Sequence, residues 1–359
     1  MSALWDASWW AALAATFAIS MLVTALSIRY AHWNNLLDLP GRRRSHDQPT
    51  PRGGGIGIVV AVMLACVVVG TFSPNFQAWS IVVGVAIVAA VGWIDDHRGL
   101  HASVRLLAHF AGCAIALLPA FVELARTPHA FPPSALYALA AFALVACVWS
   151  VNLHNFMDGI NGLLALQAIF VLCALAFCEI TARPQPKVAA ILLWAGAVAG
   201  FVPFNFPRAR IFMGDVGSGV LGLLVGIAVA WQMADGSAVL WTGLIACSAF
   251  ATDATCTLVS RIVRGRRWYS AHREHLYQWL ARGGFTHAQV VSIYMAWNLC
   301  VVAPVLYLAN RGGVPAGYAS VFPEAQTGLA YAIAVYAAAT VLWIVGKRRV
   351  LHRAWNGIE

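Results

Sequence analysis

Apolar runs long enough to cross a lipid bilayer recur along the whole 359-residue chain. A spanning helix needs about 20 apolar residues, and we count eleven candidate runs. They lie at 9–28, 55–72, 77–94, 102–122, 134–151, 162–179, 188–204, 217–233, 238–258, 289–309 and 326–346. Hydrophobic residues make up 61% of the chain and charged residues 10%, against about 45–50% and about 25% in soluble domains. The sequence therefore predicts an all-α, polytopic integral membrane protein, with a single transmembrane domain over 1–359.

Basic residues are divided unequally between alternate connections. Nineteen of the 23 lie in one set of connections, and the other set holds only Arg126, Arg183, Lys187 and Arg311. Because basic loops stay in the cytoplasm, we expect an outside N-terminus and a cytoplasmic C-terminus. The net charge of +9 then lies at the cytoplasmic headgroups and indicates a lipid surface, not nucleic acid, as partner. The cytoplasmic loops expected to form the site lie at about 29–54, 95–101, 152–161, 205–216 and 259–288.

Carboxylates gather at the cytoplasmic ends of these runs. They stand in the strings GWIDDHRGL (Asp95 and Asp96), NLHNFMDGINGLL (Asp158) and RIFMGDVGSG (Asp215). Each string alone is compatible with a polar loop between two helices. However, ionisable groups near the membrane are costly, so several at one face indicate a functional site. The Asp, Asn and Gly residues around them favour a hard cation and a phosphate over a thiolate-bound metal.

The first two strings differ in geometry. Asp95 and Asp96 are adjacent, so on a helix their side chains point in different directions and can serve different partners. Asn152, Asn155, Asp158 and Asn161 recur every third residue, which in a helix places them on one face. A face of carbonyl and carboxylate oxygens suits a magnesium-bound diphosphate.

The third string places a carboxylate between glycines. Asp215 follows Gly214 where the eighth run begins, and a helix N-terminus with glycine backbone can hold a cation and a phosphate. Phe212 is expected either to stack on a base or to anchor the helix at the membrane interface. Asp253 lies inside the ninth run, where pairing with a basic group and lining the site are equally compatible with its position.

Two further loops carry basic residues. The string AHREHLYQWL contains His272, Arg273 and His275. Such groups suit phosphate oxygens and sugar hydroxyls. A basic helix at the membrane interface would have a similar sequence, so that alternative stays open. SHDQPTPRGGGIG joins His46 and Arg52 to three glycines. We expect these glycines to let a lipid headgroup approach the backbone.

Together these strings resemble the polyprenyl-phosphate N-acetylhexosamine-1-phosphate transferases of glycosyltransferase family 4. The similar segments are PTPRGGGIG, the Asp95-Asp96 pair, NxxNxxDGxxGL from Asn152, FMGDxGS from Phe212, and HREHLYQ. They run from the first cytoplasmic loop to the last long one, so the resemblance covers nearly the whole chain. Asn161 departs from the family, which usually has a second Asp there, and a contact to nucleotide or metal is expected to be weaker.

The resemblance implies an enzyme of the bacterial inner membrane with a cytoplasmic active site. It would transfer a sugar 1-phosphate from a UDP-N-acetylhexosamine to undecaprenyl phosphate, release UMP and initiate a surface glycan such as the O-antigen of lipopolysaccharide. The implied cofactor is Mg²⁺, with Mn²⁺ as a substitute, and a homodimer is left open. The implied roles are catalytic for Asp95 and Asp96, metal-binding for Asp215 and Asn155, and substrate-binding for Asn152, Asp158, Asn161, Phe212, His272, Arg273, His275, His46 and Arg52.

Two rival functions stay open on the sequence. The phospho-N-acetylmuramoyl-pentapeptide transferases of peptidoglycan synthesis belong to the same family, although HREHLYQ differs from their triple-histidine string. A cation-coupled secondary transporter belongs to another class, but transporters place such acids near mid-membrane in paired repeats. Direct attack by the lipid phosphate and a covalent aspartyl intermediate are the two candidate mechanisms.

Overall fold

The computed structural model describes residues 7–39, 48–73, 76–126, 132–180, 186–234, 240–267, 272–311 and 321–356. His46 therefore lies outside the described residues. The chain divides into two compact units, Met1–Ser237 and Ala238–Glu359, and each is treated by itself below.

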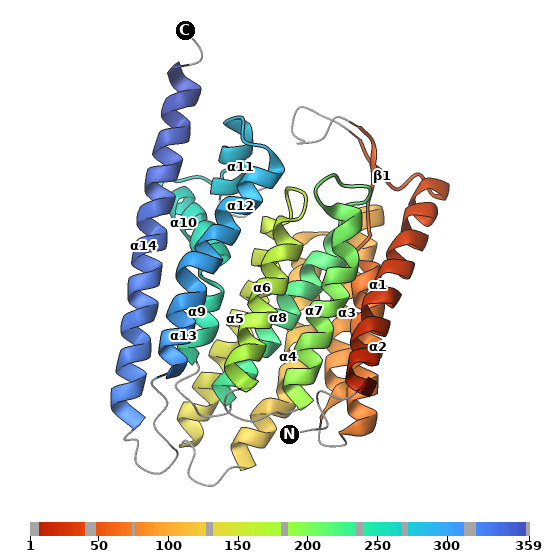
Figure 1. The fold of residues 1–359 in the computed structure, drawn as a ribbon, viewed down its shortest axis with the longest axis vertical. Helices are drawn as coiled ribbons and strands as arrows, with labels where there is room; N and C mark the ends of the chain where they lie inside the picture. The colour runs from red at the N-terminus through yellow and green to blue at the C-terminus, as the bar shows by residue number, and fades with distance from the viewer. Residues whose placement is uncertain are drawn as a thin grey trace. The chain divides into compact units, whose positions relative to one another are not determined.

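The described residues of the first unit form a bundle of eight helices (Figure 1). They are α1 (Ala7–Trp33), α2 (Ile56–Phe72), α3 (Ala78–Arg98), α4 (Ala102–Arg126), α5 (Pro133–Met157), α6 (Leu163–Ile180), α7 (Pro186–Asn205) and α8 (Asp215–Ala234). Helix α8 lies inside the bundle, because 89% of the residues in Asp215–Gln232 are buried, against 22% for the apolar part of α1. It packs chiefly against α5 and α3.

Glycines on α8 allow this central position. A Cβ at Gly222 would lie 2.5 Å from the Ser150 carbonyl oxygen of α5, and one at Gly226 would lie 2.6 Å from the Cys147 sulfur. Small residues of this kind let helix backbones approach one another where lipid removes the hydrophobic driving force. As a result, the backbones of α8 and α5 lie close together along the middle of α8.

A short pair of strands precedes α2 and was not predicted from the sequence. β1 (Leu37–Asp38) and β2 (Thr50–Pro51) pair antiparallel, with Leu37 opposite Pro51. The chain after β2 then runs along the segment before α8: the Phe212 N–H donates to the Pro51 carbonyl oxygen at 2.8 Å, and the Gly54 N–H donates to the Phe212 carbonyl oxygen at 2.9 Å. This backbone pairing brings the first loop next to Asp215.

The second unit is also helical within its described residues. It contains α9 (Leu240–Ala246), α10 (Ser248–Val263), α11 (Leu276–Arg282), α12 (His287–Trp297), a π-helical stretch η2 (Asn298–Val302), α13 (Ala303–Arg311) and α14 (Val321–Asn356). The expected ninth run, 238–258, is thus divided between α9 and α10. Helix α14 packs against α9, α10 and α11.

The described helices match a multi-pass membrane protein. Eight of them are long and apolar enough to cross a membrane, and two shorter apolar helices, Ile56–Phe72 and Leu163–Glu179, coincide with further expected runs. The nearly all-helical fold is therefore confirmed, with the four strand residues as an exception. The count of eleven spans, the single domain and the orientation of the termini stay predictions.

Candidate active site

The end of α3 and the start of α8 are joined through one carboxylate. Asp96 Oδ1 accepts a hydrogen bond from the Asp215 N–H at 2.9 Å, and Asp96 Oδ2 accepts one from the Val216 N–H at 3.2 Å. Gly214 has φ +78°, and a Cβ there would collide with the Asp96 carboxylate. The glycine before Asp215 is therefore required by this close approach. Asp96 itself is 7% exposed.

Asp95 has other partners, as its adjacency to Asp96 predicted. Its Oδ1 accepts from the Leu100 N–H, and its Oδ2 lies 2.7 Å from Arg105 Nη1 on α4. The two neighbouring carboxylates therefore serve different groups: Asp96 fixes the start of α8, and Asp95 faces a guanidinium group.

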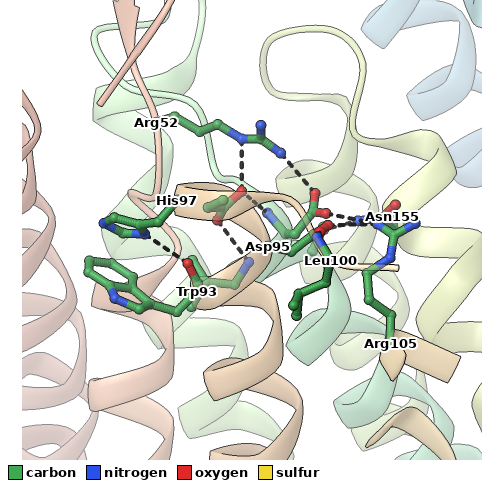
Figure 2. A network of polar contacts seen from close by, with 11 residues as sticks. Arg52, Trp93, Asp95, His97, Leu100, Arg105 and Asn155 are labelled. Carbon is green, nitrogen blue, oxygen red and sulfur yellow. Dashed lines mark hydrogen bonds and ion pairs between the residues drawn. The ribbon is translucent and has the colours of Figure 1, made fainter. Parts of the chain in front are cut away.

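Two arginines bridge these carboxylates to Asp215 (Figure 2). Arg52 Nε lies 2.8 Å from Asp96 Oδ1, and its Nη2 lies 3.1 Å from Asp215 Oδ1. Arg105 Nη1 lies 3.3 Å from Asp215 Oδ2 and also pairs with Asp95. Burial alone would lower the pKa of Arg52, but Asp96, Asp215 and Asp158 outweigh it and raise that pKa. The Arg52 guanidinium is therefore charged, and the side chains of both arginines lie among the acids.

Arg105 is a site residue that the sequence analysis missed. It stands inside the apolar run 102–122, and no motif around it marks a role. A charged residue within such a run is itself a signal of function, so the single arginine there could have been singled out.

The predicted polar face of Asn152, Asn155, Asp158 and Asn161 is only half correct. Helix α5 ends at Met157, and Asp158 follows it with φ −86° and ψ 60°. Only the two earlier residues share a helical face, because Gly162, with φ +77°, belongs to a turn that reverses the chain before α6.

The asparagines have separate partners. Asn155 Nδ2 donates to Ser218 Oγ of α8 at 3.1 Å, which places it beside the start of that helix. Asn152 Nδ2 donates to the Val148 carbonyl oxygen at 2.7 Å. Asn161 is half-buried and donates to the Pro207 carbonyl oxygen at 3.3 Å. Phe212, half-buried, is held through its backbone by the first loop.

The charge of the cluster suits a divalent cation. If all ionised, the four carboxylates of Asp95, Asp96, Asp158 and Asp215 would carry two more negative charges than the two guanidinium groups neutralise. Burial, with the charges of Asp215 and Asp96, outweighs Arg52 and raises the pKa of Asp158 to about 7. A bound cation would relieve the same repulsion.

The donor atoms fit magnesium and not a thiolate metal. Among the described residues, no group of three or more His, Cys, Asp or Glu side chains is arranged to hold a metal by itself. Magnesium does not need such a cage, because it keeps several waters and is bound through one or two carboxylates plus substrate phosphates. Asp215 and Asp158 offer carboxylate oxygens, and Asn155 offers an amide oxygen.

The basic loop predicted to bind substrate belongs to the second unit. His272 and Arg273 are half-buried, whereas His275 is 2% exposed and starts α11. Burial, His275 and Arg261 lower the pKa of His272 to about 4, so this imidazole is neutral near pH 7. Within this loop, His272 can therefore offer hydrogen bonds and Arg273 can offer charge.

Comparison with known proteins matches this chemistry. The profile described as glycosyl transferase family 4 matches residues 78–232, the part that holds all four carboxylates. A decaprenyl-phosphate N-acetylglucosaminephosphotransferase of Mycobacterium tuberculosis is 30% identical over 298 residues, 72% of this chain and 72% of that protein. The chain belongs to glycosyltransferase family 4.

Other family members show how broad the likeness is. The protein of the same name from Mycolicibacterium smegmatis is 28% identical over 93% of this chain and 86% of its own length. A phospho-N-acetylmuramoyl-pentapeptide-transferase of Lactiplantibacillus plantarum is 29% identical over 48% of this chain and 58% of its own. The resemblance stated from the motifs is therefore confirmed, and membership in a transferase family favours an enzyme over a transporter.

Asp158→Asn is expected to stabilise the metal-free protein at alkaline pH. The pKa of about 7 lies above the value of about 3.9 for a free Asp, so folding opposes ionisation and the stability of the wild type falls as pH rises between these values. Asn mimics the neutral form. Thermal unfolding in detergent with EDTA should show an advantage of the variant that grows from pH 4 to pH 7 and then levels off. An equal effect at every pH would contradict this assignment.

Proposed function

We propose that this protein transfers an N-acetylhexosamine 1-phosphate from a UDP-sugar to a polyprenyl phosphate, undecaprenyl phosphate in particular, and releases UMP. The reaction would take place at the cytoplasmic face of the bacterial inner membrane and initiate a surface glycan such as the O-antigen. The observation that carries the proposal is the cluster of Asp95, Asp96 and Asp215 with Arg52 and Arg105, drawn from separate segments to the ends of apolar helices. Such a place gives access both to a nucleotide and to a lipid phosphate.

The two arginines are suited to bind the phosphate groups. A guanidinium can donate two parallel hydrogen bonds to phosphate oxygens, and both side chains are about one-third exposed, 34% for Arg52 and 35% for Arg105. In this proposal, Arg52 binds the lipid phosphate, and Arg105, between Asp95 and Asp215, binds the diphosphate of the donor. Asp215, Asp158 and Asn155 would hold Mg²⁺, which when bound supplies positive charge to the diphosphate and the departing UMP.

Direct displacement needs little help from a base. A phosphate monoester has a second pKa of about 6, so the attacking lipid phosphate is already largely ionised near pH 7. Asp95 is the better candidate to position it or take its last proton, because Asp96 already accepts two backbone N–H groups. The attacking oxygen forms a bond to the β-phosphorus, and the bond to the oxygen of UMP breaks.

A panel of donors tests the proposal. The purified protein is incubated with undecaprenyl phosphate, Mg²⁺ and one donor per reaction: UDP-N-acetylglucosamine, UDP-N-acetylgalactosamine or UDP-N-acetylmuramoyl-pentapeptide. The lipid is then extracted and its mass is measured by mass spectrometry. We expect a lipid diphosphate sugar from an N-acetylhexosamine donor. Product only from the muramoyl donor would assign the peptidoglycan reaction, and no product from any donor would refute the transferase. UMP release without lipid phosphate would replace direct displacement by the covalent mechanism.

Arg105 is expected to be necessary for donor use. Arg105→Ala removes the guanidinium that bridges Asp95 and Asp215, and loss of such a charge-stabilising donor costs about 10²–10³-fold in rate. Arg105→Lys keeps the positive charge but lacks the forked donors of the guanidinium. Its kcat/KM should therefore lie between those of Arg105→Ala and the wild type. Arg98→Ala, on the exposed end of α3, is the matched control and should retain activity. An Arg105→Ala variant with the kcat/KM of the wild type would show that Arg105 does not bind the donor diphosphate.

A further inference from the structure

The buried carboxylate of Asp253 is the centre of a hydrogen-bond cluster in the second unit. Asp253 lies on α10 and is 1% exposed. Its Oδ1 accepts from the Leu276 N–H at 2.7 Å and from Trp343 Nε1 at 3.0 Å. Its Oδ2 accepts from the Tyr294 hydroxyl at 2.7 Å and from the Tyr277 N–H at 3.4 Å. One side chain thus connects α10 to the start of α11, to α12 and to α14.

The surroundings of Asp253 favour a structural role over direct contact with a polar substrate. One side of the carboxylate faces a cavity of about 300 Å³ whose walls include Ile293, Leu342 and Ala339. An isolated carboxylate beside such apolar walls would be costly. The cluster supplies donors only, with Thr257 Oγ1 as a further one at 3.3 Å, so the carboxylate oxygens are satisfied by the protein itself.

The segment that Asp253 holds is the one that follows the basic loop. Leu276 and Tyr277 are the first two residues of α11, directly after His272, Arg273 and His275. His275 Nδ1 lies 3.8 Å from Asp253 Oδ1. The loop is also fixed at Glu274, between Arg273 and His275. Glu274 pairs with Arg261 and, at 3.0 Å, with Arg266. The loop is therefore held at Glu274 by arginines and at its end by Asp253.

We propose that Asp253 is a positioning residue that sets the place of His272 and Arg273 for recognition of the donor sugar. This inference rests on the proposed function, because it takes the loop to contact the sugar. Asp253 acts through the backbone of α11 and touches neither substrate nor metal. The sequence left open pairing with a basic group or lining the site. The hydrogen bonds to Asp253 come instead from backbone N–H groups and uncharged side chains, and the proposal rests on these contacts.

The test compares Asp253→Asn and Tyr294→Phe with a matched control. Tyr336→Phe removes the hydroxyl of a half-buried tyrosine of the second unit, which donates to the Leu244 carbonyl oxygen at 2.9 Å and not to Asp253. For each protein, the amide hydrogen exchange of residues 272–282 is measured together with KM for the donor, kcat, selectivity between the two epimeric UDP-N-acetylhexosamines, and the Mg²⁺ concentration for half-maximal rate.

We expect Asp253→Asn to speed exchange at Leu276 and Tyr277 and to raise the donor KM, each about tenfold, the usual effect of losing a hydrogen bond to a charged group. Selectivity should fall, while kcat and the Mg²⁺ requirement stay within about twofold of the wild type. Tyr294→Phe should move the same quantities in the same direction by less, and Tyr336→Phe should move none. If Asp253→Asn does not fold, the same measurements on Tyr294→Phe test whether the Asp253 cluster positions the loop.

Unchanged exchange at 276 and 277 would overturn the inference. A fall in kcat with an altered Mg²⁺ requirement and an unchanged donor KM would overturn it as well, because Asp253 would then act on the reaction itself. The proposed function can fail separately: if the wild type uses no UDP-sugar, the exchange measurement still decides whether Asp253 holds the loop.

Discussion

Asp215→Asn is expected to abolish sugar-phosphate transfer while leaving the protein folded in detergent. Asp215 pairs with both guanidinium groups, at 3.1 Å to Arg52 and 3.3 Å to Arg105, and it offers the carboxylate from the first turn of the central helix α8. Asn has nearly the same shape but no charge, so it would hold a divalent cation poorly. A loss of about 10²–10³-fold or more in kcat is expected, measured as labelled lipid formed at saturating donor and acceptor.

Two control measurements test whether the loss of activity in Asp215→Asn comes from a weakened metal site. Glu123→Gln, on an exposed position of α4, changes the net charge equally and should retain full activity. Raising the Mg²⁺ concentration should recover a part of the activity of Asp215→Asn, because a weakened metal site fills at higher concentration. Full activity of Asp215→Asn at ordinary Mg²⁺ concentration would mean that another group holds the cation.

The helix boundaries explain which parts of this site the sequence could predict. Adjacent residues on a helix point in different directions, so the separate partners of Asp95 and Asp96 followed from their positions in α3. The same periodicity failed for Asp158 and Asn161, because α5 ends at Met157. The glycines of that string could have indicated the turn, since glycine interior to a helix is unfavourable and often marks its end.

Other parts of the site depend on long-range pairing that has no local signal. The β1–β2 pair has two residues in each strand, too few for an alternating pattern. The backbone bonds from Pro51 and Gly54 to Phe212 join segments about 160 residues apart in the printed sequence. These bonds bring Arg52 to Asp215, and the sequence could assign Arg52 to a phosphate but not to those carboxylates.

One glycine of the first loop has a structural use that was not predicted. The approach of a lipid headgroup to these glycines stays a prediction, and the structure packs Gly55 against Gly217 of α8. A Cβ on Gly55 would collide with the Gly217 Cα and would lie 2.9 Å from the Met213 carbonyl oxygen. Both obstacles are backbone atoms, which cannot move aside as a flexible side chain would.

Gly55→Ala and Gly217→Ala are therefore expected to be among the most destabilising small substitutions in the first unit. Each forces the segment 50–55 away from α8 and withdraws Arg52 from Asp96 and Asp215. Inserting a group into a packed core costs about 1–3 kcal/mol and occasionally more, and we expect the upper end or beyond in the free energy of unfolding, measured by denaturant titration in detergent.

Gly219→Ala is the matched control for this contact. It lies two residues further along α8, and its Cβ would meet only side-chain carbons, Val88 Cγ1 at 3.2 Å and Val151 Cγ1 at 3.7 Å. The gain of about 1 kcal/mol from Ala over Gly in a helix should offset much of that crowding. Equal stability of Gly217→Ala and Gly219→Ala would show that the first loop does not press on α8, and Arg52 would then need another means of reaching the carboxylates.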